Sequence, residues 1–267
     1  MINLRDQIEF GWAAFLRLGF TLTPRGYHTL GSMDHLAIFG TDYLELIAAP
    51  AGERRRADIL DAPIGLNGLI FGTEDSASVH AALAAAGVPV EPPEQFSRPV
   101  EIAGGKRDAV FRTVRLTSGA VPAGRVYFCH HFTRDLVWRD EWRHHANGVV
   151  GIARAVIAAR EPNGFGALFA RMFGESAEQP ILHGFSLAVG LARVDVITPA
   201  ALLAAFGPAA PDVDGRDEFM AALTLRTRSL DLTAAALAAG GVEGLRESDR
   251  TVVPAKDACG VALEFRA

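Results

Sequence analysis

Two stretches of this sequence align without a gap when one is shifted along the chain onto the other. The first is Leu69–Val88, LIFGTEDSASVHAALAAAGV, and the second is Leu223–Val242, LTLRTRSLDLTAAALAAGGV. Each begins with β-forming residues, passes through a short polar segment into an Ala/Leu-rich run, and then reaches glycine. Glycine adopts the left-handed conformation that ends a helix without the steric cost of a Cβ. The pattern therefore predicts a repeated strand–helix unit.

Further helix ends and strand-like runs extend this repeat over the whole chain. The helix ends are Phe15–Phe20 and Phe169–Gly174. The strand-like runs that would close the four units are Asp42–Ile47, Arg125–His130, Arg193–Ile197 and Gly260–Phe265. We therefore expect an α+β fold of four βαβββ-type modules. Residues 133–147, rich in aromatic and charged side chains, separate a first half, roughly residues 1–135, from a second half, residues 148–267.

The composition is that of a globular protein, because 49% of the 267 residues are hydrophobic and 21% are charged. A net charge of -5 argues against nucleic-acid binding, which needs clustered positive charge. Both cysteines, Cys129 and Cys259, lie in apolar runs, so we expect free thiols in a reducing compartment. No apolar run approaches the roughly 20 residues that span a bilayer, and no secretory signal pattern is visible. We therefore expect a cytoplasmic protein that binds neither nucleic acid nor a membrane.

Six groups of residues form strings that are typical of one family. They are Leu18–Gly26, His28 with Gly31–His35, Asp42–Leu46, Phe96–Pro99, Tyr127–His131 with Trp138 and Arg139, and His145–Gly148. Together they resemble the glyoxalase-like domain family of the vicinal-oxygen-chelate superfamily, over nearly the whole chain. The resemblance implies that the modules pair into two domains with curved mixed sheets. It also implies a functional cleft in the first half, whereas the second half is expected to be structural.

Two features depart from the family pattern. Position 34 holds aspartate where the resemblance implies asparagine. Only four residues precede Arg5 and Asp6, which resemble the family's first strand-to-helix junction, so the first β-strand is expected to be missing. A start site set too far downstream and a natively short chain are the two explanations. Because a bare strand edge promotes association, we expect a partner chain, a loop or Met1–Leu4 itself to cover it, with a homodimer favoured.

Glu45 is the first candidate for chemistry. Alternate side chains of a strand share a face, so Tyr43, Glu45 and Ile47 should point one way and Leu44 and Leu46 the other. If the leucines pack under the helices, Glu45 faces the concave side, where a buried carboxylate needs a cation, a proton or a hydrogen bond. The resemblance implies a metal ligand at this position. The alternative is a glutamate that is paired with Arg98 or Arg25.

His131 is the second candidate. By the same alternation, Tyr127, Cys129 and His131 share the matching face of the second module. His131 could be a metal ligand or a general base, because imidazole titrates near neutrality. It could equally be a hydrogen-bonded histidine in the wall of a polar cleft. Cys129 is expected to be a buried filler.

Five residues of the family-like strings are candidates for substrate binding. They are His28, His35, Arg98, His145 and Asn147. Trp138 and Trp142 lie near the last two in the sequence, and aromatic walls with a few convergent polar groups are typical of small-molecule pockets. The alternative is a linking segment that is anchored by its tryptophans.

A divalent metal ion is implied by the superfamily, but neither half supplies a complete set of ligands in the usual positions. The first half offers only Glu45 and His131, and Gly68 occupies a first-strand position. The second half offers Asp195 and Glu264. A catalytic divalent ion normally has about three protein ligands. We therefore expect weak or absent metal and two alternative functions: a metal-assisted lyase, isomerase or dioxygenase acting on a small oxygenated metabolite, or a metal-free small-molecule binding protein.

Overall fold

The first half contains two open sheets, one from each of its modules. The computed structural model describes all residues, 1–267. The strands of the first sheet are β1 Ile2–Asn3, β2 Gly26–Tyr27, β3 Met33–Ile38, β4 Tyr43–Ala48 and β5 Gly65–Leu66. Those of the second are β6 Gly68–Thr73, β7 Glu94–Ile102, β8 Gly105–Arg115 and β9 Arg125–His131. The strand orders are β2-β3-β4-β1-β5 and β6-β9-β8-β7. The helices are α1 Ile8–Arg17, α2 Ala57–Leu60 and α3 Ser76–Ala85, with 3-10 helices at Arg54–Arg56, Arg134–Leu136 and Asp140–Trp142.

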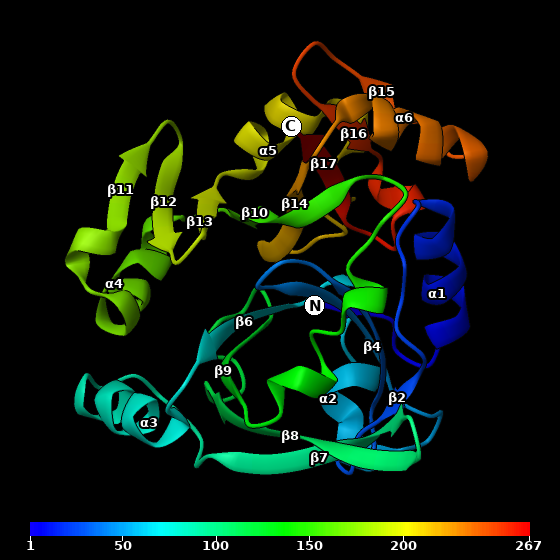
Figure 1. The fold of residues 1–267 in the computed structure, drawn as a ribbon. Helices are drawn as coiled ribbons and strands as arrows, with labels where there is room; N and C mark the ends of the chain where they lie inside the picture. Colours follow the sequence, from blue (N-terminus) through cyan, green and yellow to red (C-terminus); the bar gives the residue numbers. More distant parts are fainter.

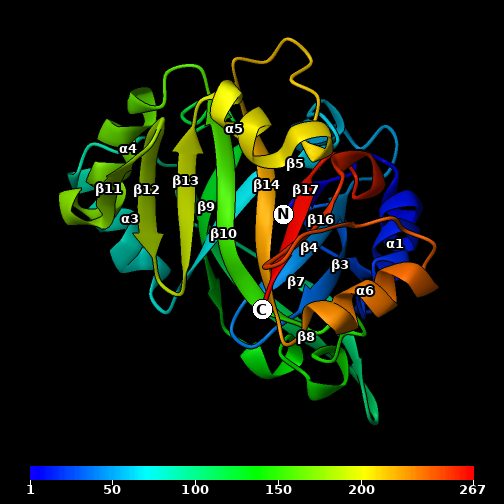
Figure 2. The same cartoon turned by 90° about the horizontal axis from the view of Figure 1, so that it is seen from above.

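The second half forms one sheet of eight strands (Figure 2). Its strands are β10 Val149–Ala159, β11 Glu178–Ile181, β12 Gly184–Val189, β13 Ala192–Ile197, β14 Glu218–Thr227, β15 Leu245–Arg246, β16 Thr251–Val253 and β17 Ala262–Arg266. They follow the order β11-β12-β13-β10-β14-β17-β16-β15. The helices are α4 Asn163–Phe173, α5 Pro199–Phe206 and α6 Leu230–Ala239, with 3-10 helices at Glu175–Ala177, Gly207–Ala209 and Ala255–Asp257.

The predicted repeat is confirmed. In each of the four modules the first strand pairs in parallel with the last: β1 with β4, β6 with β9, β10 with β13, and β14 with β17. The two aligned stretches agree even in their helix caps, because the side chains of Asp75 and Ser229 accept hydrogen bonds from the first amides of α3 and α6. After these helices, Gly87 and Gly241 take positive φ angles of 69° and 64°. The mixed α+β architecture follows from this repeat.

The expectation of a missing first strand is wrong. Ile2 and Asn3 form β1, which pairs in parallel with β4 and antiparallel with β5, so it lies inside the sheet. The Met1 amino group donates to the carbonyl oxygen of Gly68 at 2.9 Å. Two residues are enough because Ile2 and Leu4 are fully buried in the core, while the Asn3 side chain donates to one carbonyl oxygen within α2 and to two just after it. Of the three expected covers for the edge, Met1–Leu4 is the one that the structure shows.

The two halves share a hydrophobic core although no strand pairs between them. Figure 1 shows the second half above the first, with α1 beside α6. The largest core cluster contains Phe15 and Leu46 from the first half together with Phe169 and Phe265 from the second. The division of the chain into two folding domains therefore stays a prediction.

Both cysteines are buried and unpaired.

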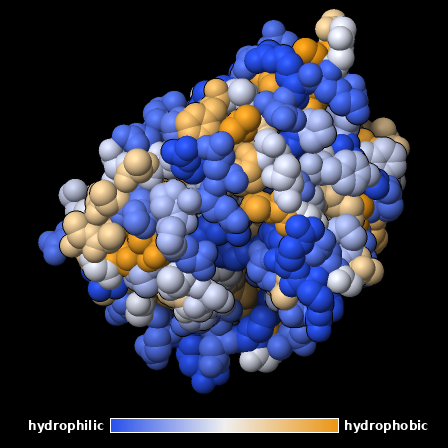
Figure 3. Space-filling model, turned by 90° about the horizontal axis from the view of Figure 1, so that it is seen from below, coloured by the Kyte–Doolittle hydropathy of each residue, from blue (hydrophilic) through white to orange (hydrophobic).

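None of the helices is both long enough and apolar enough to cross a bilayer. On the face in Figure 3, the lower side of Figure 1, apolar patches are small and separated by hydrophilic side chains.

Gly240 lies where the two halves approach each other closely, and we predict that a larger residue at this position destabilises the protein. A Cβ at this position would lie 1.8 Å from the carbonyl oxygen of Arg17 at the end of α1. The Arg17 side chain also donates to the carbonyl oxygen of Gly240 at 2.9 Å. Gly240→Ala should force α6 away from α1 and lower the free energy of unfolding by about 2 kcal/mol, measured by urea denaturation.

The matched control is Gly164→Ala in α4, where a Cβ meets nothing within 4 Å. This substitution should not destabilise the protein. Equal stability of the two variants would contradict the prediction.

Candidate functional site

A main cavity of about 290 Å³ lies between the two halves. Strands β4, β6 and β9 of the first half supply one side of it, and β10, β13 and β14 of the second half supply the other. A smaller recess of about 30 Å³ lies between the two sheets of the first half. Tyr43, Glu45 and Cys129 line both spaces. The recess has room for an ion or a water molecule, whereas the main cavity can hold a small organic molecule.

The alternation of β4 places Glu45 where these two spaces meet. Leu44 and Leu46 pack into the largest core cluster, while Tyr43 and Glu45 point to the cleft. Glu45 is only 8% exposed. Burial, and then the charge of Asp34, raise the pKa of the Glu45 carboxyl well above its usual range.

Neither arginine named in the alternative for Glu45 pairs with it. Arg25 binds Glu9, and the Nε atom of Arg98 lies 3.8 Å from the Asp34 carboxylate. Glu45 therefore has a buried carboxyl group that forms no ion pair with an arginine, at the boundary of a cavity.

Three possible metal ligands come together in the recess. One ligand atom each of His28, Asp34 and Glu45 lies within 4.8 Å of the other two. The β2–β3 hairpin positions His28, whose backbone N–H donates to the Ser32 carbonyl oxygen at 2.8 Å. Asp34 lies opposite Gly26 in this hairpin, where a Cβ would be 2.1 Å from the Asp34 Oδ1 atom. Glycine at position 26 is what allows the carboxylate to occupy this place.

The donor set fits a divalent metal ion. Asp34 Oδ1 is buried and has no hydrogen-bond partner, and such an atom is costly unless a ligand satisfies it. His28 Nδ1 lies 2.9 Å from Ser32 Oγ, which leaves its Nε2 atom on the Asp34 side, 3.8 Å from Oδ2. Burial lowers the pKa of His28 to about 4, so its imidazole is neutral, as a ligand must be. One imidazole and two carboxylates suit Zn²⁺, Fe²⁺ or Mn²⁺.

His131 lies in the wall of the main cavity and not in this group of three. Its Nε2 atom is 3.2 Å from the Tyr43 hydroxyl oxygen. Burial, and then the charge of Arg134, lower the pKa of His131 to about 4, so the ring is neutral at physiological pH. Glu45 and His131 thus line one cavity, but the residues that join Glu45 as possible ligands are His28 and Asp34.

The other predicted substrate-binding residues line neither of the two spaces. His35 is on the opposite face of β3, beside Trp12, with Nδ1 2.8 Å from the Thr23 carbonyl oxygen. His145 joins the Thr21 amide to the Ile38 carbonyl, and Asn147 bonds the backbone of Leu18 and Val149. Arg98 is buried next to Asp34 but lines neither space. Of the two tryptophans, Trp138 lines the main cavity and Trp142 is buried in a smaller core cluster.

Sequence reasoning did not identify Asp34 as a possible ligand. The only signal was aspartate at a position where the family resemblance implies asparagine. His28 was a candidate for substrate binding, and its proximity to Glu45 depends on a hairpin whose path the sequence does not give.

The equivalent carboxylates of the second half are neutralised by arginine. Glu264 is fully buried and lies 2.7 Å from Arg154, which also reaches Asp195 at 3.3 Å. Burial would raise the pKa of Glu264, but hydrogen bonds from Thr224 and Arg266 outweigh it and lower the pKa to about 2. Of the buried carboxylates at these strand positions, those of the first half are therefore the ones left available to a ligand.

The comparisons with known proteins agree with this architecture. Residues 4–173 match the family model described as a glyoxalase-like domain. No curated protein matches the sequence. A hypothetical protein from Staphylococcus aureus has a similar structure, with a TM-score of 0.66 at 11% identity, covering 92% of this chain and 90% of its own.

An enzyme structure is similar at the level of the fold. It is a triple mutant of 4-hydroxymandelate synthase from Streptomyces coelicolor, with a TM-score of 0.57 at 14% identity, covering 99% of this chain and 90% of its own. At such identities the similarity concerns the fold and not the reaction.

Proposed function

This chain belongs to the glyoxalase-like domain family of vicinal-oxygen-chelate proteins, and we propose that it is a metal-assisted enzyme acting on a small oxygenated metabolite. In this proposal His28, Asp34 and Glu45 hold a divalent ion in the recess, and the substrate occupies the main cavity. The observation that carries the proposal is the group of three ligand atoms within 4.8 Å of one another, on the boundary of a cavity of organic-molecule size.

The residues have distinct roles in this proposal. A bound ion would polarise neighbouring oxygen atoms of the substrate and stabilise negative charge that develops on them. Glu45 lines both spaces, so it orients the substrate oxygens toward the recess. The neutral His131 ring is hydrogen-bonded to the Tyr43 hydroxyl through Nε2, and this pair would relay a proton to or from the substrate. Proton transfer next to a carbonyl group, as in an isomerase or a lyase, is the reaction class that this arrangement supports best.

One observation favours the alternative, a metal-free binding protein. Arg98 is 3% exposed, lies beside Asp34, and has two nitrogen atoms without hydrogen-bond partners. Its fixed positive charge compensates part of the negative charge that would otherwise attract an ion. The two functions therefore differ in whether Arg98 alone or a metal ion as well balances the charge of Asp34.

Direct metal binding tests the proposal. The chelator-treated protein should bind one equivalent of Zn²⁺, Fe²⁺ or Mn²⁺ in isothermal titration calorimetry. Asp34→Asn and His28→Gln each remove one of three ligands and should weaken binding about 100-fold. The matched control is His35→Gln, on the same strand as Asp34 but on its opposite face, which should bind like the wild type. Absence of stoichiometric binding would favour the metal-free binding protein, and equal affinity in all four proteins would show that the ion binds somewhere other than at His28, Asp34 and Glu45.

A further inference from the structure

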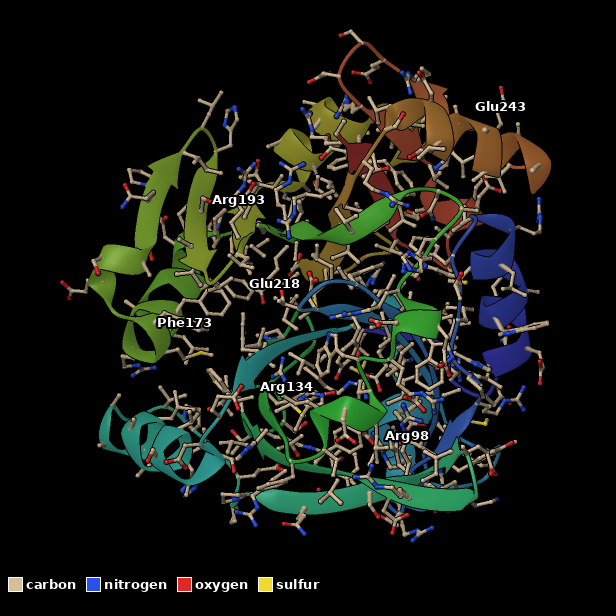
Figure 4. All side chains as sticks on the ribbon, in the orientation of Figure 1. Arg98, Arg134, Phe173, Arg193, Glu218 and Glu243 are labelled. Carbon is tan, nitrogen blue, oxygen red and sulfur yellow. The ribbon has the colours of Figure 1, made fainter.

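One wall of the main cavity contains a packed group of four side chains, which we call the Arg134 corner. It consists of Tyr43, His131, Trp138 and Arg134, and all four line the cavity. The Trp138 ring lies 5.6 Å from that of Tyr43 and 5.0 Å from that of His131. The Arg134 guanidinium stacks on the Trp138 ring at 4.5 Å. Figure 4 shows Arg134 on the side of the first half that faces the second, and Arg98 farther from it.

The Arg134 corner offers hydrogen-bond donors that the protein itself does not satisfy. Trp138 Nε1 is buried and has no partner, and leaving a buried N–H unsatisfied is unfavourable. The Arg134 guanidinium has one ion pair, with Glu74 at 3.2 Å, but Glu74 is 78% exposed, so this pair contributes little. Stacking on the indole restricts Arg134 and leaves its other N–H groups free.

The charge at this corner is positive. Arg134 is close enough to His131 that its charge helps to lower the pKa of that ring, so the corner holds a fixed cation beside a neutral imidazole. Glu45, Asp42 and Arg193 also line the cavity, and most of the remaining wall is hydrophobic. A ligand that matches this distribution has an apolar body and an anionic group at one end.

We infer that Arg134 and Trp138 form a carboxylate-binding subsite, so that the substrate is a small carboxylic acid whose acid group lies at the Arg134 corner. This inference rests on the proposed function for the role of Glu45, but not for the subsite itself. A guanidinium and a single indole N–H match the two oxygens of a planar carboxylate, because arginine binds such groups through paired N–H donors. The oxygenated group that reacts then lies beside Glu45.

The test uses the full-length protein in EDTA, so that its result does not depend on metal binding. The probes are 4-phenylbutyrate, its neutral analogue 4-phenylbutyramide, and 4-phenylbutylphosphonate, with affinities measured by ligand-observed NMR. The carboxylate should bind at least about tenfold more tightly than the amide, as expected for hydrogen bonds to a charged group. Equal affinities would overturn the inference, and tighter binding of the phosphonate would overturn the assignment to a carboxylate.

Variants connect the preference to the subsite. Arg134→Met should remove the difference between acid and amide, and Arg134→Lys should restore only part of it because lysine lacks the paired donors. Trp138→Phe should weaken binding of the acid severalfold and should change the affinity for the amide less. The matched control is Arg193→Met, which removes another partly exposed arginine near the same cavity. An unchanged acid preference in Arg134→Met, or an equal loss in Arg193→Met, would contradict the inference. Failure of the metal titration with success here would refute only the proposed enzyme.

Discussion

Glu45→Gln is expected to make the metal-free protein more stable and to abolish metal binding. The substitution removes a buried carboxyl group whose pKa is raised by burial and by Asp34. Such a group contributes stability that is fully present below its unfolded pKa and is lost as the pH rises through its folded pKa. Above pH 7 the glutamine variant should therefore gain on the order of 1–3 kcal/mol, measured by urea denaturation in EDTA, while calorimetry with Zn²⁺ or Mn²⁺ should show no binding.

Glu264→Gln is the matched control, because Glu264 also lies in the last strand of its module but is surrounded by arginines. Its carboxylate lies 2.7 Å from Arg154 and 2.9 Å from Arg266. This variant should lose stability, because Arg154 would keep a largely buried charge without its closest partner, and it should bind metal like the wild type. Destabilisation by Glu45→Gln, or metal loss in Glu264→Gln, would show that the two carboxylates had been assigned to the wrong roles.

Arg154→Met should lower the free energy of unfolding by about 3 kcal/mol, since it leaves two buried carboxylates short of a cation. Asp195 and Glu264 have side chains that are only 7% and 0% exposed. The control is Arg160→Met just beyond the same strand, where the Arg160–Asp217 pair is 74% and 64% exposed. This control should change stability by about 0.5 kcal/mol at most. Equal effects of the two substitutions in urea denaturation would refute the importance of the buried network.

The network of Glu264 with its arginines should also appear in the pH dependence of the free energy of unfolding at acid pH. The pKa of Glu264 is lowered from 4.5 to about 2, so its contribution is present above pH 4.5 and is lost as the pH falls toward 2. The shift corresponds to a loss of about 3 kcal/mol. Glu264→Gln should lack this part of the pH dependence, and an unchanged acid profile in that variant would contradict the assignment.

The sequence by itself determined the module repeat and the orientation of Glu45. The repeat could be identified because its signals are local: a cap such as Asp75 or Ser229 satisfies amides within three residues, and Gly87 and Gly241 end helices through their own backbone angles. Strand alternation is equally local, since neighbouring side chains in β4 must point to opposite faces. These features needed no knowledge of what packs against them.

Only the tertiary structure decided the composition of the candidate site. His28 and Asp34 reach Glu45 through the β2–β3 hairpin and the pairing of β3 with β4, and Gly26 leaves room for Asp34. The strand at Ile2–Asn3 could not be predicted, because its partners lie far along the chain in β4 and β5. His145 and Asn147 form part of family-like strings, yet their hydrogen bonds are to backbone groups. Residue type and spacing specify local conformation, whereas a site is made of contacts between distant segments, whose register and approach are fixed only when the whole core packs.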